Sequence, residues 1–485
     1  MPLLTKVPYR PMGKNAYKPA PWTLDGGSDY VPAEMSLRAM KVGLSKIHER
    51  KELYNEDLLD KTFGYILSKM QSIWVAPHAE NIMTFDSALE TCNMSKGPGF
   101  PYYYDHTTKG EVVENDLDLL EDRVNRIIAG EPVPCCFTLT AKTELRHKDK
   151  VREHKTRVFM ASDFHHLVAS KILYERQNQR LLETIGQHPF DVGIQLPGPQ
   201  YVTKVASFEV ANDGDVSGND LRFNLQIANR IRLLRHRFLP PEYREAGLHL
   251  YSSTFCGFGI FEGDVYRVYH QKSGGLNTAS DNSFKTWASL VLASFALHPH
   301  LSPDQVGRFS ITSDDVLVRY YRGKFREAAQ WLSKYNEILE ADDWNERPVN
   351  QCVYLSHHLE KRFVLGVGDF VVAAGNLPKL MSSVNWIKTN PNLTFEESCV
   401  AHLLGLRMCL FPWAVHFEEV DHILGSYLSR LPVLTPVIKQ LLVARFDDFQ
   451  MSMLHTGVEF SFLSQYPQNQ VLKCVRSLIK QHTHA

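Results

Sequence analysis

The chain has 485 residues, with 53 Lys and Arg against 54 Asp and Glu and a formal net charge of −1. This length exceeds one compact core and predicts about three folding units at roughly 150 residues each. With a net charge so close to zero, any binding of nucleic acid must rest on local basic patches. No apolar run approaches the ~18 residues that a membrane span requires.

Two features of composition narrow the class of protein further. The Pro- and Lys-rich residues 1–22 lack the apolar stretch of a signal peptide and are expected to form an extended arm on a surface. The eight cysteines include no CxxC pair, and only Cys135 and Cys136 are adjacent. We therefore predict reduced thiols in a reducing compartment, rather than a disulfide framework or a zinc site.

The predicted elements follow one another without internal repeats. Loops, short helices and Pro/Gly turns fill residues 1–110. Helical periodicity then predicts helices, and period-2 runs around turn residues predict strands. The predicted order is a helix (114–130), a basic run leading into a strand (142–161), a strand ending in a loop (205–220), a helix (221–239), a hairpin (259–270), a helix (277–297), a hairpin (309–320), a helix (324–339), strands (360–374) and a mostly helical remainder (376–485). This order predicts an α+β fold with a helical C-terminal unit.

Acidic residues cluster at two predicted strand ends. "DGDVSGND" places Asp213, Asp215 and Asp220 after a strand, and "FSITSDDVLVRY" places Asp314 and Asp315 at a hairpin tip. Each stretch alone is also an ordinary turn sequence. Together, the two strand ends are expected to meet in one sheet and to hold two divalent cations, because a two-metal site needs hard oxygen ligands on rigid supports.

A polar stretch precedes the apolar helix at 277–297. In "KSGGLNTASDN", Thr278 and Asn282 are four residues apart and so share a helix face. This pair would either hydrogen-bond a sugar hydroxyl or, with Asn277, cap the helix. A basic run, "KTELRHKDKVREHKTRVF", carries seven cations against three acids and is either a solvated face or a channel for triphosphate and template. Its cations are Lys142, Arg146, Lys148, Lys150, Arg152, Lys155 and Arg157.

In this order, the motifs resemble those of the RNA-dependent RNA polymerases of positive-strand RNA viruses, chiefly the picornavirus and calicivirus group. The basic run resembles the fingers motif, "DVSGND" the Asp-x4-Asp palm motif, and "SGGLNTASDN" the Ser-Gly, Thr and Asn pattern. "SDD" stands where most relatives have Gly-Asp-Asp. "GPGFPY" at 97–102 resembles the template-entry loop, "HLEKRFV" at 358–364 the primer grip, and "LPKLMSSVNWIK" at 377–388 the start of the thumb.

The resemblance implies a closed right hand with an antiparallel-sheet palm and a mainly helical thumb. It implies fingers at 1–205, a palm at 206–375 with a fingers insertion at about 238–272, and a thumb at 376–485. Asp215, Asp314 and Asp315 would be catalytic and bind two Mg²⁺ ions, with Mn²⁺ as a substitute. The implied nucleotide-binding residues are Lys142, Arg146, Lys155, Arg157, Asp220, Ser273, Thr278 and Asn282, and the implied RNA-binding residues are Lys150, Ser95, Lys96 and Gly97.

The same resemblance implies partners and a place of action. These are an RNA template and nascent strand, ribonucleoside triphosphates, a protein primer and other viral replication proteins, at replication complexes in the host cytoplasm. Three departures from the family pattern stand out. Ser313 replaces the usual Gly, Asp343 occupies the place of a Lys that would protonate pyrophosphate, so no general acid is assigned, and the chain begins Met1-Pro2 where picornavirus enzymes begin with a processed Gly.

Three other functions fit parts of the pattern less well. A reverse transcriptase also uses paired Asp on a hairpin, but it excludes the 2′-OH with a bulky residue where this chain has Asp220. A non-catalytic RNA-binding relative would have no physical reason to retain repelling carboxylates at 215, 314 and 315. A generic metal-dependent hydrolase would leave the basic run and the face of Thr278 and Asn282 unexplained.

Overall fold

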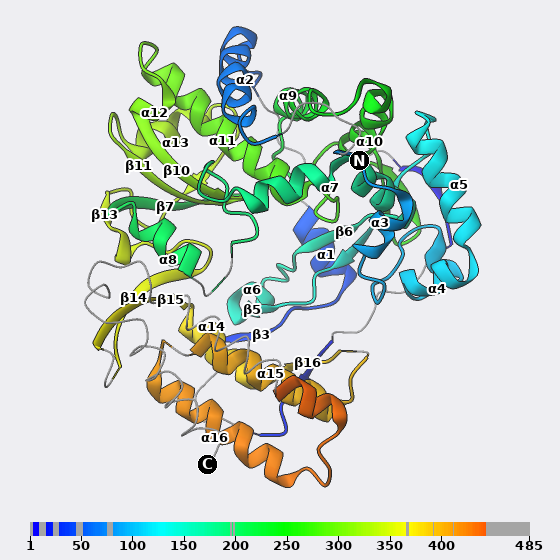
Figure 1. Ribbon diagram of the computed structural model, residues 1–485, viewed down its shortest axis with the longest axis vertical. Coiled ribbons are helices and arrows are strands. Elements are labelled where there is room, and N and C mark those ends of the chain that lie inside the picture. The colour runs from blue at the N-terminus through cyan, green and yellow to red at the C-terminus, as the bar shows by residue number, and fades with distance from the viewer. Residues whose placement is uncertain are drawn as a thin grey trace.

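A computed structural model describes residues 3–8, 16–22, 29–44, 52–74, 81–194, 196, 199–364, 368–390, 392–410 and 412–442 (Figure 1). Two parts of the sequence-based predictions fall outside these residues. They are the Met1-Pro2 start and the last part of the predicted thumb, 443–485. In the part of the chain that the structure describes, no helix is long and apolar enough to cross a membrane.

A mixed five-stranded sheet carries the basic run. Its strand order is β1 (Leu3–Lys6), β9 (Asp264–Arg267), β8 (Phe258–Phe261), β4 (Cys136–Ala141) and β6 (Val158–Ala161). Only the β4–β8 pair is parallel. The predicted hairpin at 259–270 is confirmed as β8–β9, whose turn residues Glu262 and Gly263 both have positive φ. The strand predicted at the end of the basic run is β6.

An antiparallel sheet holds both predicted acidic strand ends. Its order is β10 (Gly307–Thr312), β11 (Asp315–Tyr320), β7 (Val210–Val216) and β12 (Leu339–Glu340), and β13 (Arg347–Pro348) pairs with the start of β7. The two strand ends that carry the acids therefore do meet in one sheet, as the sequence predicts. Asp315 belongs to the strand β11, so the connection is shorter than predicted and consists of Ser313 and Asp314.

The helix α11 (Thr278–Leu297) packs behind this sheet and is buried along most of its length. Around it lie α2 (Glu56–Met70), α9 (Leu225–His236) and α13 (Phe325–Ser333). A single apolar core joins these helices to β10 and β11. The sequence predicts a helix over 324–339, but α13 ends at Ser333. Asn336 takes φ of 59° there, and the chain turns into the strand β12 instead.

The helix α7 (Phe164–Glu183) packs against α3 (Phe85–Glu90), α5 (Leu117–Ile128) and α10 (Arg244–Cys256). The helix predicted over 114–130 is two helices, because the backbone changes direction at Asp116, which ends the first and begins the second. The remaining helices before residue 350 are α1 (Leu37–Leu44), η3 (Tyr102–Tyr104), α4 (Lys109–Asn115), α6 (Lys148–Arg152), α8 (Pro199–Ala206), η4 (Pro241–Tyr243), α12 (Pro303–Val306) and η5 (Val349–Gln351).

The C-terminal part begins with the hairpin β14 (His357–Val364) and β15 (Gly368–Gly375), which confirms the predicted strands. Helices and one short strand follow: α14 (Leu377–Val384), β16 (Trp386–Lys388), α15 (Phe395–Leu410) and α16 (Ala414–Arg430). Figure 1 shows these helices as a separate layer at the C-terminal end of the described chain. Their own apolar core supports the prediction of a helical C-terminal unit.

The N-terminal arm pairs with both the mixed sheet and the C-terminal part of the chain. Its strand β1 extends the mixed sheet, β2 (Tyr17–Pro19) pairs with β16, and β3 (Tyr30–Pro32) pairs with β5 (Leu145–His147). The Trp22 indole donates a hydrogen bond to the Val384 carbonyl (3.1 Å) and packs edge-on against Tyr427. The described parts of the predicted arm are thus extended and lie against the rest of the protein.

Candidate active site

Two carboxylates face each other across the antiparallel sheet. In the β7–β11 pair, Asp215 lies directly opposite Asp315, so their side chains project from the same face. Asp314 lies in the two-residue turn beside them, and its carbonyl accepts a hydrogen bond from Val216 N (2.8 Å). Strand pairing and the turn therefore bring together the three acids that the sequence predicts as metal ligands.

The helix α11 fixes the turn that carries Asp314. Ser313 has φ of 58°, in the left-handed region that favours glycine. Its N–H donates to Ser283 Oγ (2.8 Å), and its carbonyl accepts from Thr286 Oγ1 (2.7 Å). Because hydrogen bonds hold the peptide groups on both sides of Ser313, the strained backbone is retained with serine in place of the family's usual glycine.

Burial and mutual repulsion both act on the acids. Burial is the largest cause that raises the pKa of Asp215 to about 6 and that of Asp315 to about 7, and the charge of Asp314 is the next cause for both. The Arg157 guanidinium opposes these shifts. Three crowded oxygen ligands of this kind fit divalent magnesium, since a bound cation would relieve the repulsion that the raised pKa values report.

A fourth carboxylate, Glu340, borders the same group. It lies opposite Asp215 on the other side of β7, in the two-residue strand β12, and its charge further raises the pKa of Asp215. Nothing in the sequence pattern marks Glu340, because "LE" has no strand signal of its own and only the long-range pairing with β7 places it here.

Asp220 and Asn282 are also brought together. Asn282 Nδ2 donates to Asp220 Oδ1 (2.5 Å) and to Ser313 Oγ (3.2 Å). Burial is the main cause that raises the pKa of Asp220, and the hydrogen bond from Asn282 opposes it. The pair therefore lies beside the turn that carries the predicted metal ligands, where the sequence-based interpretation expects a sugar-reading face.

Ser273 and Thr278 use their hydroxyl groups within the protein. Ser273 Oγ accepts a hydrogen bond from Met160 N (3.0 Å), which ties its loop to β6. Thr278 Oγ1 donates to the carbonyls of Lys272 (2.6 Å) and Gly275 (2.9 Å). These contacts agree with the alternative that Thr278 stabilises the start of α11, and both residues shape the loop before that helix.

Three cations of the basic run surround one acid, Glu144, which the sequence-based prediction did not include among the site residues. Glu144 lies 3.2 Å from Arg146, 3.6 Å from Arg157 and 3.8 Å from Lys142, measured between charged atoms. Burial lowers the pKa of Lys142, and the charges of Asp314 and Asp220 act against that shift. The Glu144 cluster therefore orients its cations next to the acids.

The remaining predicted nucleotide- and RNA-binding residues are Lys155, Lys150 and the loop of Ser95, Lys96 and Gly97. Lys155 pairs with Glu153 (2.5 Å), whereas the charge of Lys150 reaches Asp215 and lowers its pKa. Ser95, Lys96 and Gly97 form an exposed loop that Lys109 holds through the carbonyls of Lys96 and Gly97. No described contact brings this loop to the acids.

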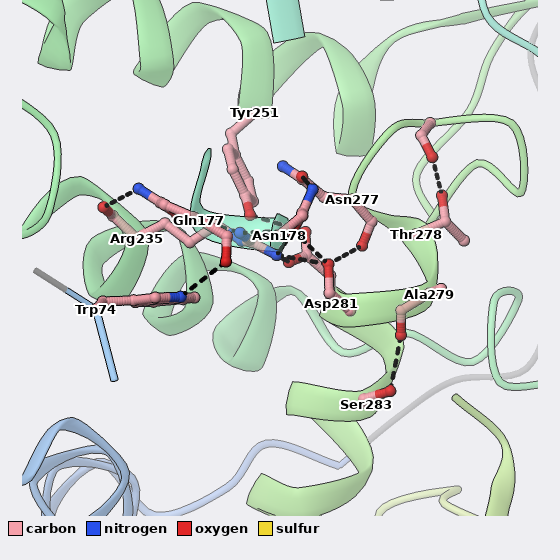
Figure 2. A network of polar contacts seen from close by, with 12 residues as sticks. Trp74, Gln177, Asn178, Arg235, Tyr251, Asn277, Thr278, Ala279, Asp281 and Ser283 are labelled. Atoms are coloured by element: carbon pink, nitrogen blue, oxygen red, sulfur yellow. Dashed lines mark hydrogen bonds and ion pairs between the residues drawn. The ribbon is translucent and has the colours of Figure 1, made fainter. Parts of the chain in front are cut away.

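A buried polar network supports α11 from behind (Figure 2). Arg235 is fully buried and forms an ion pair with Asp281 (2.7 Å), whose second oxygen accepts from Tyr251 (2.7 Å). Arg235 also donates to Gln177 (3.2 Å) and Ser280 (2.7 Å). Because Asp281 immediately precedes Asn282, this network fixes the turn of α11 that presents the amide to Asp220.

Acids paired on an antiparallel sheet, with basic side chains whose charges act on them, suit the binding of divalent metal ions and of phosphate groups. Comparison with known proteins identifies the family. The family model described as viral RNA-dependent RNA polymerase matches residues 44–430, and the chain belongs to that family. The predicted resemblance and the enzyme class are confirmed.

Individual relatives agree with this assignment. The genome polyprotein of Ornithogalum mosaic virus is 23% identical over 306 residues, 58% of this chain and 26% of that protein. The polyprotein of Sweet potato mild mottle virus (isolate Salazar) is 31% identical over 188 residues, 36% of this chain and 5% of that protein. The chain thus spans about a quarter or less of the curated relatives it matches.

A solved structure shares the fold. The Sicinivirus 3Dpol RNA dependent RNA polymerase superposes with a TM-score of 0.74 at 17% identity, over 92% of this chain and 99% of that chain. The chain therefore has the right-hand polymerase fold that the sequence predicts.

Proposed function

We propose that this chain copies the genome of a positive-strand RNA virus by two-metal nucleotidyl transfer, with Asp215, Asp314 and Asp315 as the metal ligands. The observation that carries the proposal is the direct opposition of Asp215 and Asp315 across β7 and β11, with Asp314 in the adjoining turn. Two Mg²⁺ ions, or Mn²⁺ in their place, would supply Lewis-acid stabilisation and a more nucleophilic primer hydroxyl.

The cations around Glu144 bind and orient the triphosphate. Because a phosphoryl transition state spreads negative charge over its oxygens, positioned cations supply much of the stabilisation. Arg157 and Lys142 suit this role because their charges interact with the acids of the site. Arg146 shares the same carboxylate, and Lys155 lies at the outer end of the run.

Asp220 and Asn282 recognise the ribose of the incoming nucleotide. A buried hydrogen-bonding pair rejects a substrate that lacks the matching hydroxyl, because the polar groups are then left without a partner. Asn282 Oδ1 is buried and has no hydrogen-bond partner among the described residues, so it is available to a ligand. Ser273 and Thr278 contribute by holding the loop that leads into α11.

The division into fingers (1–205), palm (206–375, with the insertion at about 238–272) and thumb (376–485) belongs to the same proposal. It is supported by the antiparallel sheet within 206–375 and by the separate apolar core after residue 376. RNA would enter past Ser95, Lys96, Gly97 and Lys150. A protein primer and other replication proteins are proposed partners, and the enzyme would act in the cytoplasm of the infected host cell, at viral replication complexes.

The test is primer extension with purified protein. It uses an RNA primer–template, ribonucleotides or deoxyribonucleotides, and Mg²⁺ or Mn²⁺, beside an Asp314→Asn/Asp315→Asn control. Extension with ribonucleotides that the control lacks would support the proposal. Equal extension with deoxyribonucleotides would indicate a reverse transcriptase. No extension with any metal or candidate protein primer, despite RNA binding, would indicate a non-catalytic module.

A further inference from the structure

A second group of metal-ligating side chains lies outside the proposed polymerase site. Cys135 directly precedes β4, Asp163 is the N-cap of α7, and His166 lies in the first turn of that helix. The Cys sulfur, a carboxylate oxygen and a His ring nitrogen all lie within 4.8 Å of one another. The three residues are at most 3% exposed, so the group is enclosed by protein.

Two buried side chains of this region have polar atoms without a hydrogen-bond partner among the described residues. Neither ring nitrogen of His166 has a hydrogen-bond partner among the described residues. The same holds for both amide atoms of Gln271, which is 1% exposed and lines a small cavity together with His166. Because burying a polar group without a partner is costly, these atoms point to a ligand.

The fold already orients the ligand atoms. One oxygen of Asp163 accepts from Cys136 N (3.0 Å), and the other accepts from His166 N (3.2 Å). Such contacts behind a metal ligand fix its direction and are a regular part of metal sites.

The chemistry of the three ligands selects the metal. One sulfur, one imidazole nitrogen and one carboxylate oxygen are typical ligands of zinc, whereas magnesium prefers oxygen alone. A thiolate, a carboxylate and Zn²⁺ together have no net charge, which suits a buried site.

We propose that Cys135, Asp163 and His166 bind one zinc ion, with a water molecule from the adjoining cavity as the fourth ligand. The zinc ties β4 to the start of α7. Gly99 packs directly onto this point, since a Cβ there would lie 2.6 Å from the Ser162 carbonyl. The ion therefore braces the loop at 97–102 and the strand that leads to Lys142. The cysteine pattern contains no CxxC pair and predicts reduced thiols rather than a zinc site, and the proposal departs from that prediction.

Cys136, adjacent to Cys135 in the sequence, supplies a matched control for the test. The full chain is stripped with a chelator, incubated with zinc in the presence of excess Mg²⁺, desalted, and its zinc measured by elemental analysis. We expect one zinc per chain in the wild type and in Cys136→Ser, and loss of zinc in Cys135→Ser and His166→Gln. Asp314→Asn should keep its zinc, which separates this site from the proposed catalytic metals.

Cobalt substitution keeps the proposal open to refutation if the ligand variants fold poorly. Wild-type protein loaded with Co²⁺ should show a thiolate-to-cobalt charge-transfer band, and Cys136→Ser should retain it. A wild-type chain that binds no zinc, or cobalt binding without a thiolate band, would overturn the proposal. So would a folded Cys135→Ser variant that binds zinc as well as the wild type does.

Discussion

Asn282 donates its amide to Asp220 at 2.5 Å and to Ser313 Oγ at 3.2 Å, so a single side chain connects the proposed sugar-reading acid to the turn that carries the proposed metal ligand Asp314. Ser313, which replaces the family's usual glycine, therefore accepts a hydrogen bond within the site. A change at Asn282 should alter nucleotide selection without removing the metal ligands.

We expect Asn282→Ala to reduce the preference for ribonucleotides over deoxyribonucleotides by roughly 5- to 100-fold, because a buried polar contact is worth about 1–3 kcal/mol. The measurement is the ratio of kcat/KM for matched ribo- and deoxyribonucleotides in primer extension. Asn125→Ala, on an exposed position of α5, serves as the control. An unchanged ratio in Asn282→Ala would remove the residue from sugar recognition.

Asp314→Asn should reduce nucleotide incorporation by more than about a hundredfold, because it removes a charged metal ligand whose effect on the transition state is several kcal/mol. Folding should be retained, since Asp314 lies in a turn that is held by backbone contacts. Single-turnover extension measures the rate, and the exposed Asp342→Asn is the control. Wild-type rates in Asp314→Asn would exclude the proposed metal site.

The acids and the sheet that holds them could be predicted because their signals are local. Two strand patterns with acids at their ends predict that Asp215, Asp314 and Asp315 lie together, although each stretch alone is also an ordinary turn sequence. Glu340 and Glu144 could not be found in this way, since each acquires its position from a partner distant in sequence. The helix predicted beyond Ser333 failed because Asn336 takes a left-handed conformation, which helical periodicity does not reveal.

Arg157→Ala should raise the KM for nucleotides by about tenfold or more, since a hydrogen bond to a charged group is worth about 1.5–3 kcal/mol. The Arg157 charge reaches Asp215, Asp220 and Asp315, so its loss should be felt at the site. Arg152→Ala, an exposed cation of the same run, is the matched control. Equal KM values for the two variants would place Arg157 outside the nucleotide channel.

The pH dependence of stability offers a test that needs no substrate. The folded, metal-free chain holds the pKa of Asp315 at about 7, against an ordinary value of 3.8. The folded state therefore binds the proton more tightly than the unfolded state does. The raised pKa of Asp315 lowers the free energy of unfolding. This destabilisation is complete above about pH 7 and disappears as the pH falls towards 4.

Asp315→Asn removes this penalty. In metal-free buffer the variant should gain stability relative to the wild type as the pH rises from about 5 to 8, and added Mg²⁺ should reduce the difference. Urea titrations at several pH values give the free energies of unfolding. Buried histidines such as His166 affect both proteins alike and cancel in the comparison. A stability difference between Asp315→Asn and the wild type that stays constant with pH would contradict the raised pKa of Asp315.

The network behind α11 should be important for stability. Arg235→Met leaves the buried carboxylate of Asp281 without its cation, and breaking a buried ion pair in this way costs about 3–5 kcal/mol. Urea unfolding measures the loss, with the exposed Arg237→Met as the control. The double variant Arg235→Met/Asp281→Leu should recover part of the stability, because no unpaired charge then remains. If Arg235→Met were as stable as Arg237→Met, the ion pair would not be what holds this turn of α11 against α9.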